Sequence, residues 1–102
     1  MKRIMVRYKV KTDRVKENET YIRNVFKALA DESPSGLRYV SFKLEDGVSF
    51  VHIVSLESES GDNPLGRLPA FKAFAADIAD RCEEPPVVTS LEEVGSYRVF
   101  HH

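Results

Sequence analysis

Side chains able to do acid–base chemistry gather in two neighbouring segments, 36–44 and 49–57, around a single histidine. His52 is the only histidine before the last two residues of the chain. Because an imidazole titrates near pH ~6.5, His52 is the natural candidate for a general base. Tyr39 and Ser41 add hydroxyl groups that can orient a substrate oxygen. The structural alternative is that Ser41 or a backbone carbonyl simply holds His52 where two subunits meet.

The Asp46-Gly47 pair predicts the hairpin that brings these side chains together. Asp-Gly between two alternating runs is typical of a type I′ turn, which needs positive φ at both central residues. A turn centred there pairs Leu44 with Ser49, Phe42 with Val51, Val40 with Ile53 and Arg38 with Ser55. We expect this mostly apolar face to pack on the core. The opposite face carries Tyr39, Ser41, Lys43, Phe50, His52 and Val54, and we expect it to be open.

The remaining elements are predicted by periodicity and by turn residues. Residues 3–10 alternate as a strand, with Ile4, Val6, Tyr8 and Val10 on one side. A helix capped by Thr12 or Asp13 runs to about Asp31, and residues 58–63 form a loop. A second helix spans about 69–83, with Cys82 on its buried stripe, and Pro85-Pro86 ends it. Residues 87–100 return to extended character, with Gly95 as a bend.

The order strand, helix, strand, strand, helix, strand predicts an α+β ferredoxin-like fold, βαββαβ. Both helices then cover one face of an antiparallel sheet. We expect one domain over residues 1–100. His101 and His102 are interpreted as a possible tag remnant and receive no functional role.

Composition narrows the class of protein. The chain has 102 residues, 15 basic against 16 acidic side chains, and a formal net charge of −1. This balance gives no reason to expect a nucleic-acid or membrane partner. One cysteine permits no internal disulfide, and no signal peptide or run of ~20 apolar residues is visible. We therefore expect a cytoplasmic protein.

Three stretches resemble a known family. They are Val10-Lys11-Thr12-Asp13, the strand from Phe50 to Glu57, and Leu68-Pro69-Ala70-Phe71-Lys72-Ala73-Phe74. In element order and length, nearly the whole chain resembles the antibiotic biosynthesis monooxygenases, which are dimeric α+β barrels. The resemblance implies a homodimer joined through the open sheet faces, with the last strand often reaching onto the partner. Some members oxidise phenolic or quinol molecules with dioxygen and neither metal nor flavin, so no cofactor is expected. The absence of tryptophan argues against the haem-degrading branch.

An oxidation of this kind suggests a role for each candidate residue. The substrate must become an electron-rich anion, so His52 is the proposed base and Tyr39 the group that orients its oxygen. The candidates for substrate binding are Ser41, which also orients the oxygen, Phe50 and Val54, which exclude water, and Asn63 and Arg67, which stabilise the anion.

Two other functions remain open at this stage. The first is a dimer that binds a small ligand or assists another protein without chemistry, because fold does not fix function. The second is RNA binding, since RNA-recognition domains share this element order. The segment from Gly47 to Ile53 lacks the first stacking aromatic at Val48, and the net charge of −1 disfavours RNA.

Overall fold

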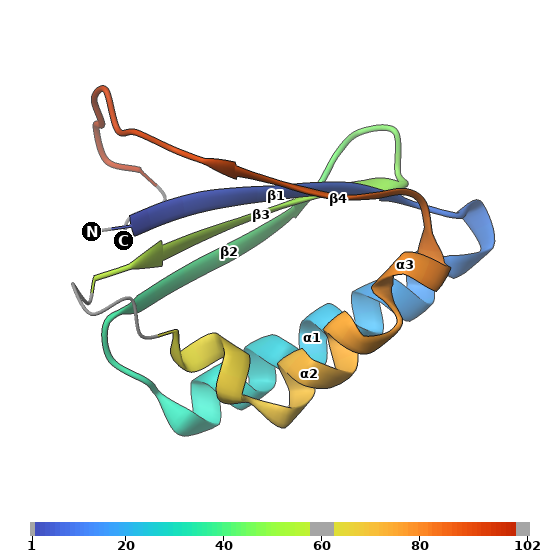
Figure 1. The fold of residues 1–102 in the computed structure, drawn as a ribbon, viewed down its shortest axis with the longest axis horizontal. Helices are drawn as coiled ribbons and strands as arrows, with labels where there is room; N and C mark the ends of the chain where they lie inside the picture. Colours follow the sequence, from blue (N-terminus) through green and yellow to red (C-terminus); the bar gives the residue numbers. More distant parts are fainter. Residues whose placement is uncertain (1, 58–62, 100–102) are drawn as a thin grey trace.

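The computed structural model describes residues 2–57 and 63–99 and shows one antiparallel sheet covered on one side by helices (Figure 1). Residues 58–62 of the predicted loop at 58–63, the end of the last predicted strand and the two terminal histidines lie outside the described residues. In the sheet, the strands β1 (Lys2–Val10), β2 (Leu37–Lys43), β3 (Ser49–Leu56) and β4 (Cys82–Ser90) take the order β2-β3-β1-β4. This is the ferredoxin-like arrangement that the sequence predicts.

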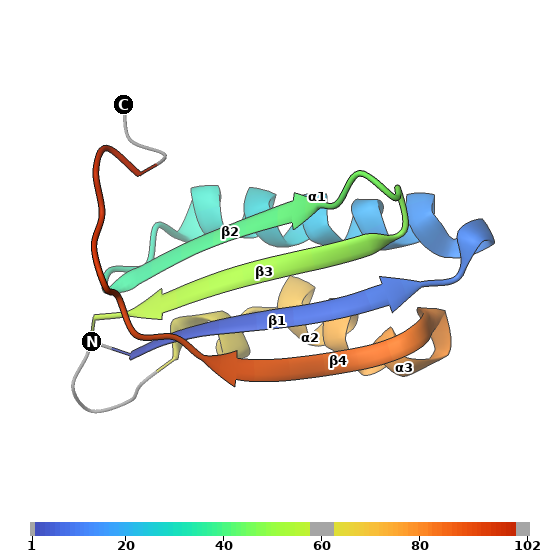
Figure 2. The same cartoon turned by 90° about the horizontal axis from the view of Figure 1, so that it is seen from above.

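The helices lie on the same side of the sheet, as expected (Figures 1 and 2). The 3₁₀ turn η1 (Thr12–Arg14) leads into α1 (Val15–Glu32), which crosses behind β2 and β3. The second helical region is shorter than predicted and divided. It consists of the 3₁₀ turn η2 (Pro64–Arg67), α2 (Pro69–Ala76) and α3 (Ile78–Arg81).

The predicted end of the second helix at Pro85-Pro86 is wrong, because both prolines lie inside β4. The strand begins at Cys82, whose side chain is buried in the core as expected. Among the described strands β4 pairs only with β1, so it is an edge strand that can accommodate residues without a backbone N–H. Arg7 of β1 pairs with Val87 of β4, and Lys9 pairs with Glu84. One residue of β1 therefore lies opposite the two prolines of β4, and this extra residue in β4 is a β-bulge.

The predicted register of the hairpin is confirmed, but its predicted turn type is wrong. β2 and β3 pair Arg38 with Ser55 and Phe42 with Val51. Gly47 has a φ of +78°, whereas Asp46 is not in the positive region, so the turn is not type I′. The Gly47 N–H donates to the Leu44 carbonyl at 3.0 Å, which is the pattern of a tight turn followed by a left-handed glycine.

The predicted assignment of the two sheet faces is reversed. Phe50, His52 and Val54 are buried beneath the helices, together with Tyr8 and Val10 of β1. Val40, Phe42, Val51 and Ile53 form the helix-free face instead, where Phe42 remains 37% exposed. Apolar content alone favoured the wrong face, because the polar atoms on the buried face satisfy one another and bury at little cost.

Candidate functional site

A cavity of about 230 Å³ lies between the sheet and the second helical region. Its walls are largely apolar. They are formed by Ile4, Val6, Val54, Leu65, Phe71, Phe74, Ala75, Ile78 and Pro86. The polar lining residues are Tyr8, Tyr39, His52 and Asn63. An apolar cavity with a few polar side chains is the usual form of a small-molecule site. Because a cavity of ~150 Å³ can hold benzene, this one suits a single substituted ring.

His52 is the centre of the polar part of this site. Its side chain is 3% exposed, and both ring nitrogens have hydroxyl partners. The Tyr8 hydroxyl lies 2.7 Å from Nε2, and the Tyr39 hydroxyl lies 2.5 Å from Nδ1. Burial lowers the pKa of His52 to about 4, because desolvation disfavours the imidazolium. The ring is therefore neutral at pH 7, with one donor and one acceptor nitrogen.

The two tyrosines are held by aromatic packing. Phe50 stacks on Tyr8 with ring centroids 5.5 Å apart, and Phe26 stacks on Tyr39 at 5.0 Å. Burial raises the pKa of both hydroxyl groups well above the usual range of tyrosine. Both side chains consequently stay protonated, and each carries one hydrogen that it can donate.

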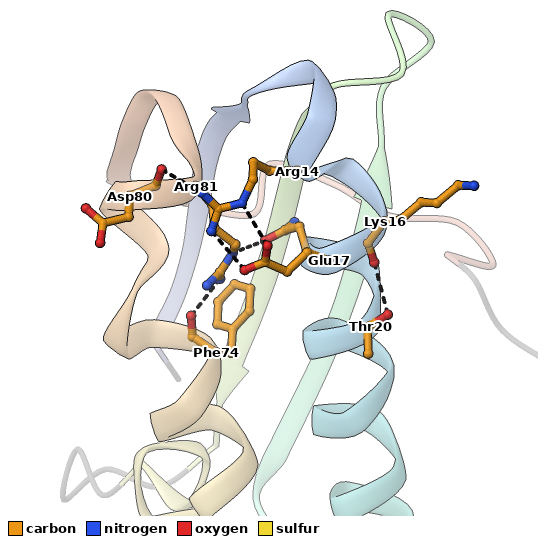
Figure 3. Close-up of polar contacts among 8 residues, drawn as sticks. Arg14, Lys16, Glu17, Thr20, Phe74, Asp80 and Arg81 are labelled. Atoms are coloured by element: carbon orange, nitrogen blue, oxygen red, sulfur yellow. Dashed lines mark hydrogen bonds and ion pairs between the residues drawn. The ribbon is translucent and has the colours of Figure 1, made fainter.

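The hydrogen bonds continue from His52 to a buried arginine. Asn18 Nδ2 lies 2.9 Å from the Tyr8 hydroxyl, and Arg81 Nε lies 3.2 Å from Asn18 Oδ1. Arg81 Nη2 also donates to the carbonyl oxygen of Phe74 at 2.7 Å (Figure 3). The guanidinium lies over the Tyr21 ring, 4.4 Å from its centroid, and is fully buried.

The first turn of α1 is fixed beside this arginine. The Arg14 guanidinium binds both carboxylate oxygens of Glu17, at 2.7 and 2.9 Å, and lies 3.5 Å from the carbonyl oxygen of Asp80 (Figure 3). The hydrogen bonds from Arg14 hold the pKa of the Glu17 carboxyl below its usual range. These contacts join the start of α1 to α3 and so position Asn18 against Arg81.

The structure brings together most of the residues singled out in the sequence. His52, Tyr39, Val54 and Asn63 line the cavity. Ser41 Oγ lies 3.3 Å from His52 Nε2, and Phe50 packs behind Tyr8. Asn63 caps η2, where its Oδ1 accepts from the Leu65 N–H at 3.0 Å. Arg67 is exposed at the end of η2 and does not line the cavity.

Sequence reasoning missed Tyr8, Asn18 and Arg81 as members of the site. Their signal is a polar group at a position where periodicity expects an apolar one. Asn18 falls on the stripe formed by Val15, Ile22 and Val25. Arg81 follows Phe74 and Ile78 at helical spacing, and Tyr8 lies on the inward side of β1.

Comparison with solved structures shows which proteins share this fold. A protein described as an antibiotic biosynthesis monooxygenase superposes with a TM-score of 0.75 at 14% identity, covering 93% of this chain and all of its own. A proposed antibiotic biosynthesis monooxygenase from Caulobacter crescentus gives 0.70 at 21% identity, covering 92% and 90%. A Nitrosomonas europaea protein of unknown function gives 0.72 at 16%, covering 94% and 91%. The chain thus has the fold of the antibiotic biosynthesis monooxygenases, as the resemblance implies.

No family model matches the chain, and no curated protein matches it. Within residues 2–57 and 63–99, no cluster of three or more His, Cys, Asp or Glu side chains is arranged to hold a metal ion. No helix in that part of the chain is long and apolar enough to span a membrane.

Proposed function

We propose that this chain binds a small phenolic or quinol molecule in the cavity and oxidises it with dioxygen, without a metal or organic cofactor. The observation that carries the proposal is the apolar cavity with Tyr39 and His52 among its few polar lining residues. The volume of about 230 Å³ favours one ring over a fused polycyclic system. The fold shared with proteins named monooxygenases supports the same reaction class.

The reaction needs no electrons from outside the substrate. A phenol with an unsubstituted para carbon reacts with O₂ to give a para-quinone and water. The phenolate gives one electron to O₂, and the two radicals join at the para carbon as a hydroperoxide. Loss of the para C–H proton with cleavage of the O–O bond then forms the second carbonyl and releases water.

In this proposal, the protein's part is to hold the substrate as an anion away from solvent. Tyr39 is the residue placed to contact the substrate oxygen, and a hydrogen bond there stabilises negative charge in a dry site. Val54 and the other apolar walls exclude water. His52 supports Tyr39 through Nδ1, and the imidazolium form would be favoured by a neighbouring anion. The role of His52 as general base stays a prediction, as do the binding roles of Ser41, Phe50, Asn63 and Arg67.

One observation favours the second candidate function, binding without chemistry. Both nitrogens of the His52 ring already have tyrosine partners, so a base at this position must first exchange one of them. A site that only recognises a ligand oxygen needs no such exchange.

We also propose that two copies join through the helix-free face of the sheet, the interface that the resemblance implies. This face is formed by different residues from those expected in the sequence. Met5, Val40, Val51 and Ile53 lie there, beside Phe42. The segment that follows β4 leaves the sheet on that side and exposes Val94, Tyr97 and Val99, so it offers further apolar contacts to a second copy (Figure 1).

Oxygen uptake with a panel of one-ring phenols and quinols tests the proposed function. We expect uptake by the native protein and a loss of at least about tenfold in Tyr39→Phe, which removes the hydroxyl and keeps the ring. Tyr97→Phe is the matched control, because Tyr97 is 81% exposed outside the cavity. Saturable binding without oxygen uptake would leave only the binding function, and neither binding nor uptake would reject both.

A further inference from the structure

We infer that Arg81 and Asn18 are positioning residues of the cavity, which together make the Tyr39 hydroxyl a hydrogen-bond donor to the bound ligand. This inference rests on the proposed function for its ligand, but its geometry stands on the hydrogen bonds alone. It specifies the ligand further: the oxygen placed at Tyr39 is an acceptor, as in a phenolate or a quinone carbonyl.

The direction of the hydrogen bonds begins at Arg81. A guanidinium has donors only, so the Asn18 atom that faces Arg81 Nε must be the carbonyl oxygen, Oδ1. The Asn18 amide nitrogen therefore faces Tyr8 and donates to its hydroxyl oxygen at 2.9 Å. The orientation of this amide, which is often ambiguous, is decided here by its charged neighbour.

The hydrogen bonds of Tyr8 then set the tautomer of His52. Tyr8 is 2% exposed, and its hydroxyl oxygen already accepts from Asn18. Its hydrogen has a single acceptor among the described residues, His52 Nε2 at 2.7 Å. If Nε2 instead carried the ring proton, the buried Tyr8 hydrogen would have no acceptor in that part of the chain, which is unfavourable. His52 therefore carries its proton on Nδ1.

The chain of hydrogen bonds ends at the cavity. His52 Nδ1–H donates to the Tyr39 oxygen at 2.5 Å. The hydrogen of the Tyr39 hydroxyl has no acceptor among the described residues, and Tyr39 lines the cavity. A ligand oxygen with a lone pair can accept the hydrogen of the Tyr39 hydroxyl. A ligand group that can only donate would place its hydrogen against that of Tyr39, which is unfavourable.

The burial of Arg81 gives the series a fixed starting point. The side chain is fully buried, and none of the ion pairs among the described residues involves it. Its third nitrogen, Nη1, has no partner among the described residues. The permanent positive charge of Arg81 opposes reversal of these hydrogen bonds, because reversal would turn the Asn18 carbonyl oxygen away from the guanidinium.

The test is the tautomer of His52, read from long-range ¹H–¹⁵N correlations of ¹⁵N-labelled protein without ligand. We expect the native protein to show Nδ1–H, and His52→Gln assigns the signals by removing them. An Nε2–H ring in the native protein would overturn the inference.

Asn18→Asp tests whether Asn18 sets the direction. The carboxylate accepts from both Arg81 and Tyr8, so Tyr8 must then accept from His52 Nε2–H. We expect the tautomer to switch to Nε2–H. Asn24→Asp, which adds the same charge at an exposed position of the same helix, is the matched control and keeps Nδ1–H. A native tautomer in Asn18→Asp would show that Asn18 does not set the direction.

The ligand preference is read with 4-nitrophenol, whose anion absorbs in the visible range. We expect the native protein to bind the anion about tenfold more tightly than the neutral phenol, which lowers the apparent pKa of the bound probe by about one unit. Asn18→Asp loses this preference. Equal affinity of the native protein for both forms would contradict the donor role of Tyr39. A complete lack of binding with the expected tautomers would instead count against the proposed function.

Discussion

At the scale of single residues, the site depends on polar side chains that the protein buries as a connected group. His52 is neutral because burial lowers its pKa, and it remains satisfied because two hydroxyl groups flank the ring. Arg81 is buried as a cation and is stabilised by Phe74, Asn18 and the Tyr21 ring. The contributions of His52 and Arg81 can each be measured as a change in the free energy of unfolding.

The lowered pKa of His52 predicts a defined loss of stability in mild acid. The folded-state value of about 4 lies below the unfolded value of about 6.5, so the unfolded chain binds the proton first. The free energy of unfolding is therefore complete above pH 6.5 and falls as the pH drops toward 4, by up to about 3 kcal/mol. Urea unfolding at several pH values measures this slope.

His52→Gln provides the control for that slope, because glutamine does not titrate. Carboxyl groups with lowered pKa values, such as Asp46 at about 2, reduce stability only at lower pH. We therefore expect the variant to have a nearly flat profile between pH 5 and 6.5. An equal slope in both proteins would show that His52 is not the group responsible.

Arg81→Lys should destabilise the fold although it keeps the charge. Lysine lacks the planar fork that reaches both the Phe74 carbonyl and Asn18, and it stacks less well on Tyr21. We expect a loss of about 2 kcal/mol or more in the free energy of unfolding. Arg23→Lys, at a side chain that is 68% exposed, should change stability by less than about 0.5 kcal/mol. Equal effects of the two changes would contradict the structural role of Arg81.

At the scale of elements, the sequence predicts the strands better than it predicts which face they bury. Alternation and the Asp46-Gly47 turn were enough to predict the register of β2 against β3. The buried face depends on hydrogen bonds from Tyr8 and Asn18, which lie far away in the sequence, so local apolar content pointed to the wrong side. The strand β4 was predicted too late because the edge-strand bulge that accepts Pro85 and Pro86 is a property of the assembled sheet.

The left-handed residue of the hairpin gives a prediction for this element. Gly47→Ala introduces a Cβ at a φ of +78°, where no neighbouring atom lies within 4 Å and the cost is backbone strain alone. We expect a loss of about 1 kcal/mol in the free energy of unfolding. Gly66→Ala is the matched control, since Gly66 also has open space but no positive φ. Neutral effects of both substitutions in chemical denaturation would contradict the positive φ at Gly47.

At the scale of the whole molecule, we propose that the two faces of the sheet have separate tasks. One face and the second helical region line the cavity, and the other face is proposed to bind a second copy. A change on the outer face should therefore alter assembly and leave the cavity unchanged.

Phe42→Glu tests this separation. We expect light scattering of the native 11.6 kDa chain to give the mass of a dimer, and the variant to give a monomer, because a charge within the proposed apolar interface is unfavourable. Lys27→Glu, on the exposed side of α1, should stay dimeric. A native monomer, or a variant that still forms the dimer, would contradict an interface on this face.

The position of the ligand site is the central claim, and a titration of ¹⁵N-labelled protein with 4-nitrophenol tests it most directly. We predict saturable shifts at cavity residues such as Val54, Phe71 and Tyr39, with binding weakened about tenfold in Tyr39→Phe. Shifts confined to the outer face, at Val51 and Val87, or no saturation at all, would show that the cavity is not the binding site.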